Sequence, residues 1–264
     1  MDADSYRRAI AIEGQFGSIA VAHASDGPAL ELEVRFPDPH ALPPIVERVG
    51  RMFDISADPA VIAGQLSVDP LLRRPVAAHP GLRVPGAWEP FELAVRAILG
   101  QQISVAAATT IAGRVAARWG TPTDGSPLSR LFPAAVQLAD ARLEEAGITG
   151  ARAATLRALA KAVCDGTLRF DSGTRATSLR AIPGIGDWTA QYIAMRAFNE
   201  PDAFPSGDLV LRRMAGNLGA RELDRRSEPW RPWRAYAVML LWQMARDRDG
   251  GHRGARHGPR QAKR

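Results

Sequence analysis

The sequence of 264 residues is poor in two reactive residue types, with one cysteine, Cys164, and two lysines, Lys161 and Lys263. A single cysteine excludes an internal disulfide, and its place in an apolar helical pattern predicts a buried, unreactive thiol. No apolar run approaches the roughly 18 residues that a membrane span needs. Residues 1–10 lack the apolar core of a secretory signal. We therefore expect a cytoplasmic protein that does not enter a membrane.

The charge is unevenly distributed along the chain. The formal net charge is +6, which suggests a polyanionic partner. However, seven basic residues against Asp247 and Asp249 lie from Arg246 to the end, a local balance of +5. The Gly/Arg/His composition predicts that residues 247–264 form a disordered basic tail. Contact with DNA phosphates and a merely solvated tail both fit this composition.

The first third of the chain predicts a sheet with helices, over residues 1–85. Apolar and polar residues alternate over 30–36, as in a half-buried strand. Residues 70–87 are rich in Pro, Gly and Arg, so we expect a connection there. The expected elements are strands over 9–12, 18–24 and 30–36, a helix from Pro43 through Phe53, and a shorter helix after Asp58-Pro59.

From residue 88 the apolar spacing is helical, which predicts an all-α region over residues 86–246. Pro90 and Ser104 are typical first-turn and capping residues of two of these helices. The expected helices run from Pro90 to Leu99, from Ser104 to Trp119, and over 127–137, 140–146, 150–164, 177–182, 187–198, 208–217 and 232–246.

Two of these helices are separated by Pro183-Gly184-Ile185-Gly186. Glycines at alternate positions allow a sharp turn and the close approach of another backbone. The free amides at the start of the following helix would bind an anion such as a DNA phosphate, without reading the base sequence. Taken alone, the segment equally fits a structural turn between helices.

The hairpin and its surroundings resemble the helix-hairpin-helix DNA glycosylase superfamily. The matching segments are LRAIPGIGDWTA, which begins at Leu179, the residues that follow it as far as Arg196, and PDAFPSGDL, which begins at Pro201. FELAVRAILGQQIS, beginning at Phe91, and residues 228–242 match the alkylation-repair branch, the 3-methyladenine DNA glycosylase II type. The resemblance covers residues 5–246. It implies an α+β fold, in which a TATA-binding-protein-like antiparallel sheet with helices precedes mostly α helix-hairpin-helix domains.

The resemblance assigns the chemistry to Asp208. Breaking an N-glycosidic bond builds positive charge on the sugar, which a fixed carboxylate stabilises. Gly207-Asp208 also precedes a helical pattern, so Asp208 equally suits a helix N-cap, and both roles can coexist. We interpret Asp187 and Asp202, the competing carboxylates, as a first-turn helix residue and a turn residue.

An enzyme that acts on a base extrudes it from the duplex and stacks it on aromatic side chains. Trp188 and Tyr192 are four residues apart, so they share a helix face. Trp242 stands where the family contributes another aromatic residue. Their π faces favour cationic bases such as 3-methyladenine and 7-methylguanine. The alternative for all three is that they fill the core.

The family also implies residues that hold DNA. Gly184, Gly186 and Thr189 would contact a phosphate, and Gln102 would fill the gap left by the extruded base. Bifunctional relatives place a nucleophilic lysine where this chain has Trp188, so we expect no strand cleavage. Some relatives hold a four-cysteine iron–sulfur cluster, which one cysteine cannot ligate. We therefore expect no cofactor and no metal.

The family usually begins with a further strand and helix before the segment that matches Asp4–Ile10, and some members are fused to an alkyl-transfer regulator domain. We expect either a shortened sheet or a piece of such a fusion. The expected function is base excision repair by a monomer near the nucleoid, on double-stranded DNA with alkylated bases. The alternatives are an oxidised-base glycosylase of the same superfamily and a non-catalytic helix-hairpin-helix DNA-binding module.

Overall fold

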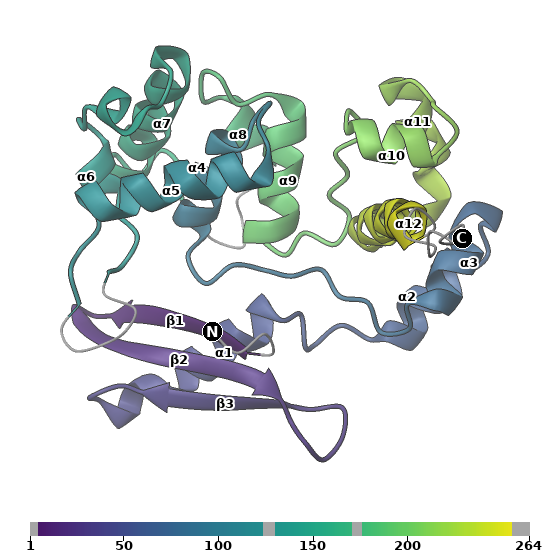
Figure 1. The fold of residues 1–264 in the computed structure, drawn as a ribbon, viewed down its shortest axis with the longest axis horizontal. Helices are drawn as coiled ribbons and strands as arrows, with labels where there is room; N and C mark the ends of the chain where they lie inside the picture. The colour runs from purple at the N-terminus through teal and green to yellow at the C-terminus, as the bar shows by residue number, and fades with distance from the viewer. Residues whose placement is uncertain (1–4, 124–129, 171–175, 255–264) are drawn as a thin grey trace, which may run out of the picture. The chain divides into compact units, whose positions relative to one another are not determined.

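The structure, a computed structural model, describes residues 5–123, 130–170 and 176–254, with side chains described as far as residue 248. The chain forms two compact units (Figure 1). The first comprises Met1–Gly50, Trp88–Phe170 and Ala181–Ile185. The second comprises Arg51–Ala87, Asp171–Arg180 and Gly186–Arg264. Residues 51–87 pack with the C-terminal helices of the second unit.

The first unit contains a three-stranded antiparallel sheet in the order β1-β2-β3 (Figure 1). The strands are β1 (Ser5–Ile12), β2 (Gln15–His23) and β3 (Leu30–Arg35), so the three expected strands are confirmed. Burial alternates along β3 because its apolar residues share one face. Ile10, Ile19 and Val21 are fully or almost fully buried and supply the apolar side of the sheet.

Helices complete the first unit. They are α1 (Leu42–Met52), which continues into the second unit, α4 (Pro90–Leu99), α5 (Val105–Trp119), α6 (Ala135–Leu138) and α7 (Gly150–Cys164). α4 packs against α5 and α7. The Ser104 hydroxyl accepts the Ala107 N–H at 3.2 Å, which confirms the expected cap of α5. Glu92 on α4 pairs with Arg8 on β1 and thereby joins the sheet to the helices.

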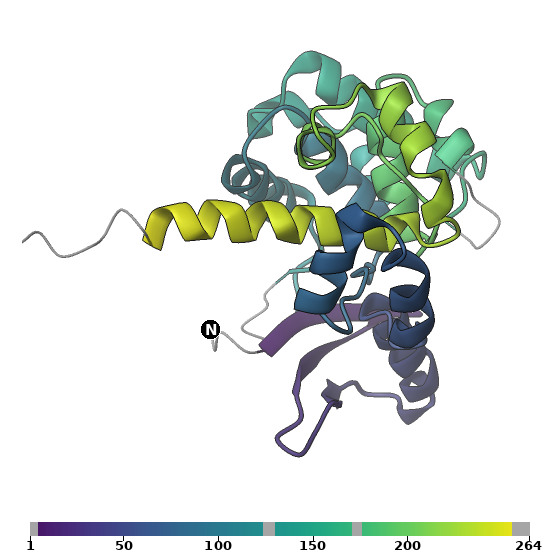
Figure 2. The same cartoon turned by 90° about the vertical axis from the view of Figure 1, so that its right-hand side faces the viewer.

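The second unit is helical. Its helices are α2 (Pro59–Leu66), α3 (Pro70–Ala78), α8 (Ala176–Arg180), α9 (Asp187–Ala197), α10 (Leu209–Met214), α11 (Ala220–Arg226) and α12 (Arg234–Gly254). α12, yellow in Figure 2, packs against α3 and α10. Leu66, Leu72, Leu211 and Leu241 are fully buried in one apolar core. A sheet followed by helices confirms the expected α+β class.

The expected connection over 70–87 is wrong in its first half, which forms α3. The Asp69 carboxylate caps this helix by accepting the Leu71 N–H at 2.9 Å, and Pro70 occupies the first turn. The same carboxylate accepts two hydrogen bonds from Arg226 and one from Trp230, at 2.7 Å. Burial raises the pKa of Asp69, but the hydrogen bonds from Arg226 and Trp230 outweigh it and leave this pKa below its ordinary value of 3.8.

Three further expectations about helices need correction. The helix expected over 127–137 is short, since α6 begins only at Ala135, after Pro133 restricts the backbone before it. Residues 124–129 lie outside the described residues. The segment expected as a helix over 140–146 contains only a short 3-10 helix, Leu143–Ala146. α11 was not expected, because three of its seven residues are Arg and its sequence offers only one buried apolar residue, Leu223.

The C-terminal region also differs from expectation. α12 continues to Gly254, so the first eight residues of the expected disordered tail are helical. Asp247 stabilises this extension because it accepts from Gln243, one turn earlier, and lies 2.8 Å from the His79 ring. Cys164 is exposed rather than buried, since it is the last residue of α7 and the buried face of that helix is made by residues such as Leu156 and Leu159.

Candidate active site

Asp208 is the N-cap of α10, as its sequence position allowed. One carboxylate oxygen, Oδ1, accepts the N–H groups of Val210 and Leu211, each at 2.9 Å. Its own N–H donates to the Pro205 carbonyl at 2.8 Å. The side chain is half-buried. The cap therefore fixes the direction of the carboxylate without removing it from solvent.

Two indole rings also hold this carboxylate. Trp188 on α9 donates its Nε1–H to Oδ2 at 2.9 Å, and Trp242 on α12 donates its Nε1–H to Oδ1 at 3.3 Å. Among the described residues, four N–H groups reach Asp208, so the arrangement suits a carboxylate that only accepts hydrogen bonds. The second unit thus gathers three sequence-predicted residues from three different helices.

The third predicted aromatic residue, Tyr192, completes the cluster. Its ring is stacked on that of Trp188, with centroids 5.3 Å apart and planes 10° from parallel. It is tilted by 46° against Trp242, with centroids 6.3 Å apart. The three side chains are half-buried. Trp188 and Tyr192 are in direct stacking contact, so no base fits between these two rings as they stand.

Arg196 is a neighbour of the cluster that the sequence analysis missed. It donates to the Tyr192 hydroxyl at 3.3 Å, and its guanidinium carbon lies 5.7 Å from the centre of the Tyr192 ring. Its Nε also donates to the Pro85 carbonyl. Arg196 follows Tyr192 by four residues on α9, so the spacing could have revealed the pair. The contact fixes the outer end of the tyrosine.

Gly184 of the hairpin belongs to the first unit, and its conformation requires glycine. Its φ is +87°, and a Cβ there would lie 1.9 Å from the Thr155 hydroxyl oxygen on α7. The Ile185 N–H donates to the Ile182 carbonyl at 3.1 Å and closes the turn. Gly184 therefore lets the turn pack directly on α7.

Gly186 belongs to the second unit and is the N-cap of α9. A Cβ on Gly186 would meet nothing within 4 Å, so space remains there for another molecule. The first hydrogen bond of α9 runs from the Ala190 N–H to the Gly186 carbonyl, at 3.0 Å. The amides before Ala190 therefore lie at the positive end of the helix. Thr189 as a whole residue is only 3% exposed, so little of it is open to contact with a ligand.

Gln102, the predicted wedge, is exposed at a turn of the first unit. Its φ is +57°, in the left-handed region that residues other than glycine rarely adopt. Arg152 holds this turn by donating to the Gln101 carbonyl at 2.6 Å, and the Gln101 side chain donates to the Gly184 carbonyl at 3.4 Å. A strained, exposed residue held by its neighbours is a common feature of ligand contacts.

Neither a metal centre nor a membrane segment appears in the part of the chain that the structure describes. No group of three or more His, Cys, Asp or Glu residues is placed there to hold a metal ion. None of the helices over those residues has the length and apolar character that crossing a membrane requires.

Comparison with family models gives two matches. Residues 1–89 match the AlkA N-terminal domain, and residues 95–229 match the HhH-GPD superfamily base excision DNA repair protein. The second match contains the hairpin, Asp208, Trp188 and Tyr192, whereas Trp242 lies beyond its end.

Three similar proteins agree with these matches. DNA-3-methyladenine glycosylase 2 of Escherichia coli is 37% identical over 74% of this chain and 70% of its own length. A Mycobacterium tuberculosis protein named "Probable bifunctional transcriptional activator/DNA repair enzyme AlkA" is 39% identical over 90% of this chain, which spans about half of that protein. The solved 3-methyladenine DNA glycosylase of Archaeoglobus fulgidus has the same fold, with a TM-score of 0.80, 20% identity, and coverage of 93% of this chain and 88% of that one.

Proposed function

Because the chain belongs to the HhH-GPD superfamily of base excision DNA repair proteins, we propose that it is a monofunctional DNA glycosylase. Its substrates would be alkylated bases of the 3-methyladenine and 7-methylguanine type in duplex DNA. The observation that carries this proposal is the Asp208 carboxylate, held by two indole N–H groups inside a cluster of aromatic rings. The E. coli relative, named for 3-methyladenine, supports the choice of substrate.

The chemistry follows from the placement of that carboxylate. As the glycosidic bond breaks, the sugar gains oxocarbenium character, and Asp208 stabilises this charge electrostatically and orients the attacking water. The cap and the indoles hold the carboxylate in advance, so little reorganisation is needed during the reaction. Alkylation weakens the bond to the base, and therefore the enzyme needs little acid assistance to the leaving group.

The aromatic cluster receives the extruded base. Since Trp188 and Tyr192 already stack on each other, the base would lie on an outer face of the cluster rather than between these two rings. A cationic alkylated purine is attracted to such a π face more strongly than a normal base. Opening of the Trp188–Tyr192 stack would instead accompany binding if the base inserted between them.

The remaining predicted residues would grip the DNA. The first amides of α9, beside the unobstructed Gly186, suit a phosphate of the DNA backbone. Gln102, exposed on its strained turn, would enter the stack where the base has left. Its amide can also hydrogen bond to the unpaired opposite base.

The absence of strand cleavage is part of the proposal. A lyase reaction requires an amine that attacks the sugar, and Trp188 stands at the position that a lysine occupies in bifunctional relatives. Lys161 lies on α7, in the other compact unit from Asp208, and pairs with Asp140 at 3.1 Å. Hydrolysis by water therefore accounts for the residues of this site better than a lyase reaction does.

The cellular location, oligomeric state and partner domain of the enzyme are also proposals. We place it in the cytoplasm at the nucleoid because its proposed substrate is chromosomal DNA, and we propose that it acts as a monomer. The M. tuberculosis relative is about twice as long, and its name joins transcriptional activation to DNA repair. This supports fusion to, or association with, an alkyl-transfer regulator domain.

The experiment that tests the function is incubation of the purified protein with methylated duplex DNA, followed by chromatography of the released bases. We expect free 3-methyladenine and 7-methylguanine, abasic sites without nicks, and no adduct trapped by borohydride. Asp208→Asn should lose base release, whereas Asp140→Asn, an exposed carboxylate on the other unit, should retain it. Full activity of Asp208→Asn would refute the assignment of Asp208, and a trapped adduct would refute the monofunctional mechanism.

A further inference from the structure

The segment that carries Asp208 is a loop, residues 198–208, between α9 and α10. Its hydrogen bonds within the loop are short-range, such as the Ala203 N–H to the Glu200 carbonyl at 3.2 Å. A loop of this kind does not by itself fix a carboxylate to within the fraction of an ångström that catalysis needs. Contacts with neighbouring helices must therefore hold it.

The first anchor comes from the start of α12. Arg234, only 8% exposed, donates to both carboxylate oxygens of Asp202, at 2.8 and 3.0 Å, and to the Asp202 carbonyl at 3.0 Å. The Ala235 N–H donates to the Pro201 carbonyl at 2.9 Å. The start of α12 is thus hydrogen-bonded to two successive residues of the loop, Pro201 and Asp202. A buried, forked guanidinium contact of this kind is directional.

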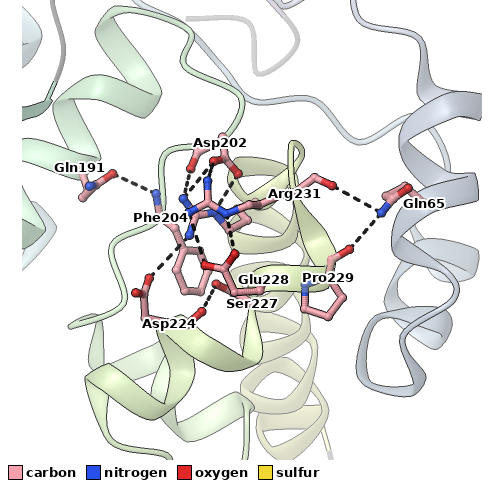
Figure 3. Close-up of polar contacts among 10 residues, drawn as sticks. Gln65, Gln191, Asp202, Phe204, Asp224, Ser227, Glu228, Pro229 and Arg231 are labelled. Atoms are coloured by element: carbon pink, nitrogen blue, oxygen red, sulfur yellow. Dashed lines mark hydrogen bonds and ion pairs between the residues drawn. The ribbon is translucent and has the colours of Figure 1, made fainter.

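The second anchor comes from α9. Gln191 accepts the Phe204 N–H at 3.0 Å (Figure 3). Phe204 is only 3% exposed, and its ring makes an edge contact with Trp230, with centroids 5.9 Å apart. The guanidinium carbon of Arg234 lies 5.6 Å from the same ring. The two anchors therefore meet at Phe204, four residues before Asp208.

The helices that anchor the loop also supply the indoles that hold the carboxylate. Gln191 follows Trp188 by three residues on α9, and Trp242 follows Arg234 by eight residues, about two turns, on α12. We propose that Gln191 and the Arg234–Asp202 pair are positioning residues, which fix the register of the loop so that Asp208 meets both indoles. The expected effect on the rate of base release rests on the proposed function, whereas the expected effect on the geometry around Asp208 does not.

The same network provides a matched control. Arg231 also pairs with Asp202, but its side chain is 46% exposed and it shares its charge with Glu228. An exposed ion pair of this kind contributes little. Arg231→Lys and Arg234→Lys thus make the same change in two arginines that both pair with Asp202. Arg231 is at the surface, and Arg234 is buried.

The first measurement is the NMR signal of each indole N–H. We expect Arg234→Lys and Gln191→Met to shift the Trp188 and Trp242 signals and to leave that of Trp119, in the other unit, unchanged. Gln191→Glu, which keeps an acceptor for the Phe204 N–H, should restore the wild-type positions. Arg231→Lys should leave all of them unchanged. Unshifted Trp188 and Trp242 signals in a folded Arg234→Lys or Gln191→Met protein would overturn the proposal.

The second measurement is the single-turnover rate of base release with saturating enzyme. We expect Arg234→Lys to slow it on the order of 10- to 100-fold, the effect of a carboxylate displaced by about 1 Å, with little change in DNA affinity. Arg231→Lys, the exposed control, should release the base at the wild-type rate. An equal loss in Arg231→Lys and Arg234→Lys would show a general structural defect instead.

The two measurements separate this inference from the proposed function. If the wild-type protein releases no base but Arg234→Lys shifts the two indole signals, the glycosylase proposal fails and the positioning holds. Gln191→Met serves as the second variant if Arg234→Lys does not fold.

Discussion

At the position of Asp208 a helix cap and an accessible carboxylate coincide, so a substitution there has two separable effects. Asparagine keeps one oxygen for the Val210 and Leu211 N–H groups, whereas alanine keeps none. Asparagine must also present an oxygen or an amino group to the Trp188 indole, and an amino group would oppose it as a second donor. Loss of the charge and loss of the cap are thus distinguishable.

We expect Asp208→Ala to be less stable than Asp208→Asn by about 1 kcal/mol, the usual value of an N-cap, while both release no base. The measurement is urea unfolding of the two variants, monitored by circular dichroism. Equal stabilities would mean that the cap contributes nothing. In that case the hydrogen bonds to α10 would serve only to orient the carboxylate.

At the same scale, the sequence located Asp208, Trp188, Tyr192 and Trp242, but not the bonds between them. The spacing of Trp188 and Tyr192 on one helix is a local property, and it suffices to predict their stacking face. The bond from Trp242 to Asp208 joins residues 34 positions apart, so it depends on how α10 and α12 pack. Thr189 was predicted as a DNA contact from its place in the motif, but the side chain is buried.

At the scale of elements, the two hairpin glycines have different physical roles. Gly184 has a left-handed backbone conformation and packs on Thr155. Gly186 has ordinary backbone dihedral angles and open space around it. The sequence motif shows two equivalent glycines. Only the packing on α7 distinguishes the glycine that the fold requires from the one that leaves room for a ligand.

We expect Gly184→Ala to destabilise the protein by more than about 1 kcal/mol, the cost of the left-handed backbone alone, because the new methyl group also collides with Thr155. Gly186→Ala should change stability by less than about 0.5 kcal/mol, as substitutions in open space do, yet weaken binding to duplex DNA. Thermal unfolding and fluorescence anisotropy with labelled DNA measure the two effects. A stable Gly184→Ala, or a Gly186→Ala that binds normally, would contradict this division of roles.

The elements that the sequence failed to predict depend on distant partners. α3 resembles a connection in its sequence because its nine residues include Pro75 and two arginines. Its cap, Asp69, is held by Arg226 and Trp230, more than 150 positions away. The helix propensity of the local sequence does not include such tertiary contacts, so it cannot predict this helix. β3 and α7, whose apolar patterns are regular and local, were predicted with nearly correct bounds.

At the scale of the whole molecule, the sequence predicts two consecutive domains, and contacts in the structure group the chain into two compact units that each combine separate segments. Residues 51–87 join the second unit because Ile62, Leu66 and Leu72 enter the core around α12. The aromatic cluster and Asp208 belong to that unit, while Gln102 and Gly184 belong to the other. The proposed catalytic group and the proposed DNA contacts are thus distributed over segments that sequence order does not group.

The last prediction concerns the net charge of +6, to which the C-terminal residues contribute strongly. Deletion of residues 255–264 removes Arg256, Arg260, Lys263 and Arg264. If all four release counterions from DNA, the slope of log affinity against log salt concentration should become shallower by about 3 to 4. Affinity should fall equally for methylated and unmethylated duplexes, because phosphate contacts carry no base information.

Anisotropy titrations from low to moderate salt measure this slope, and a full-length variant with the four basic residues changed to glutamine separates charge from chain length. The single-turnover rate at saturating enzyme should not change in either protein, since the hydrogen bonds that hold Asp208 come from Trp188, Trp242 and the first turn of α10. An unaltered slope would assign the salt dependence to the folded part of the chain. A slope altered by the deletion but not by the glutamines would instead implicate chain length rather than charge.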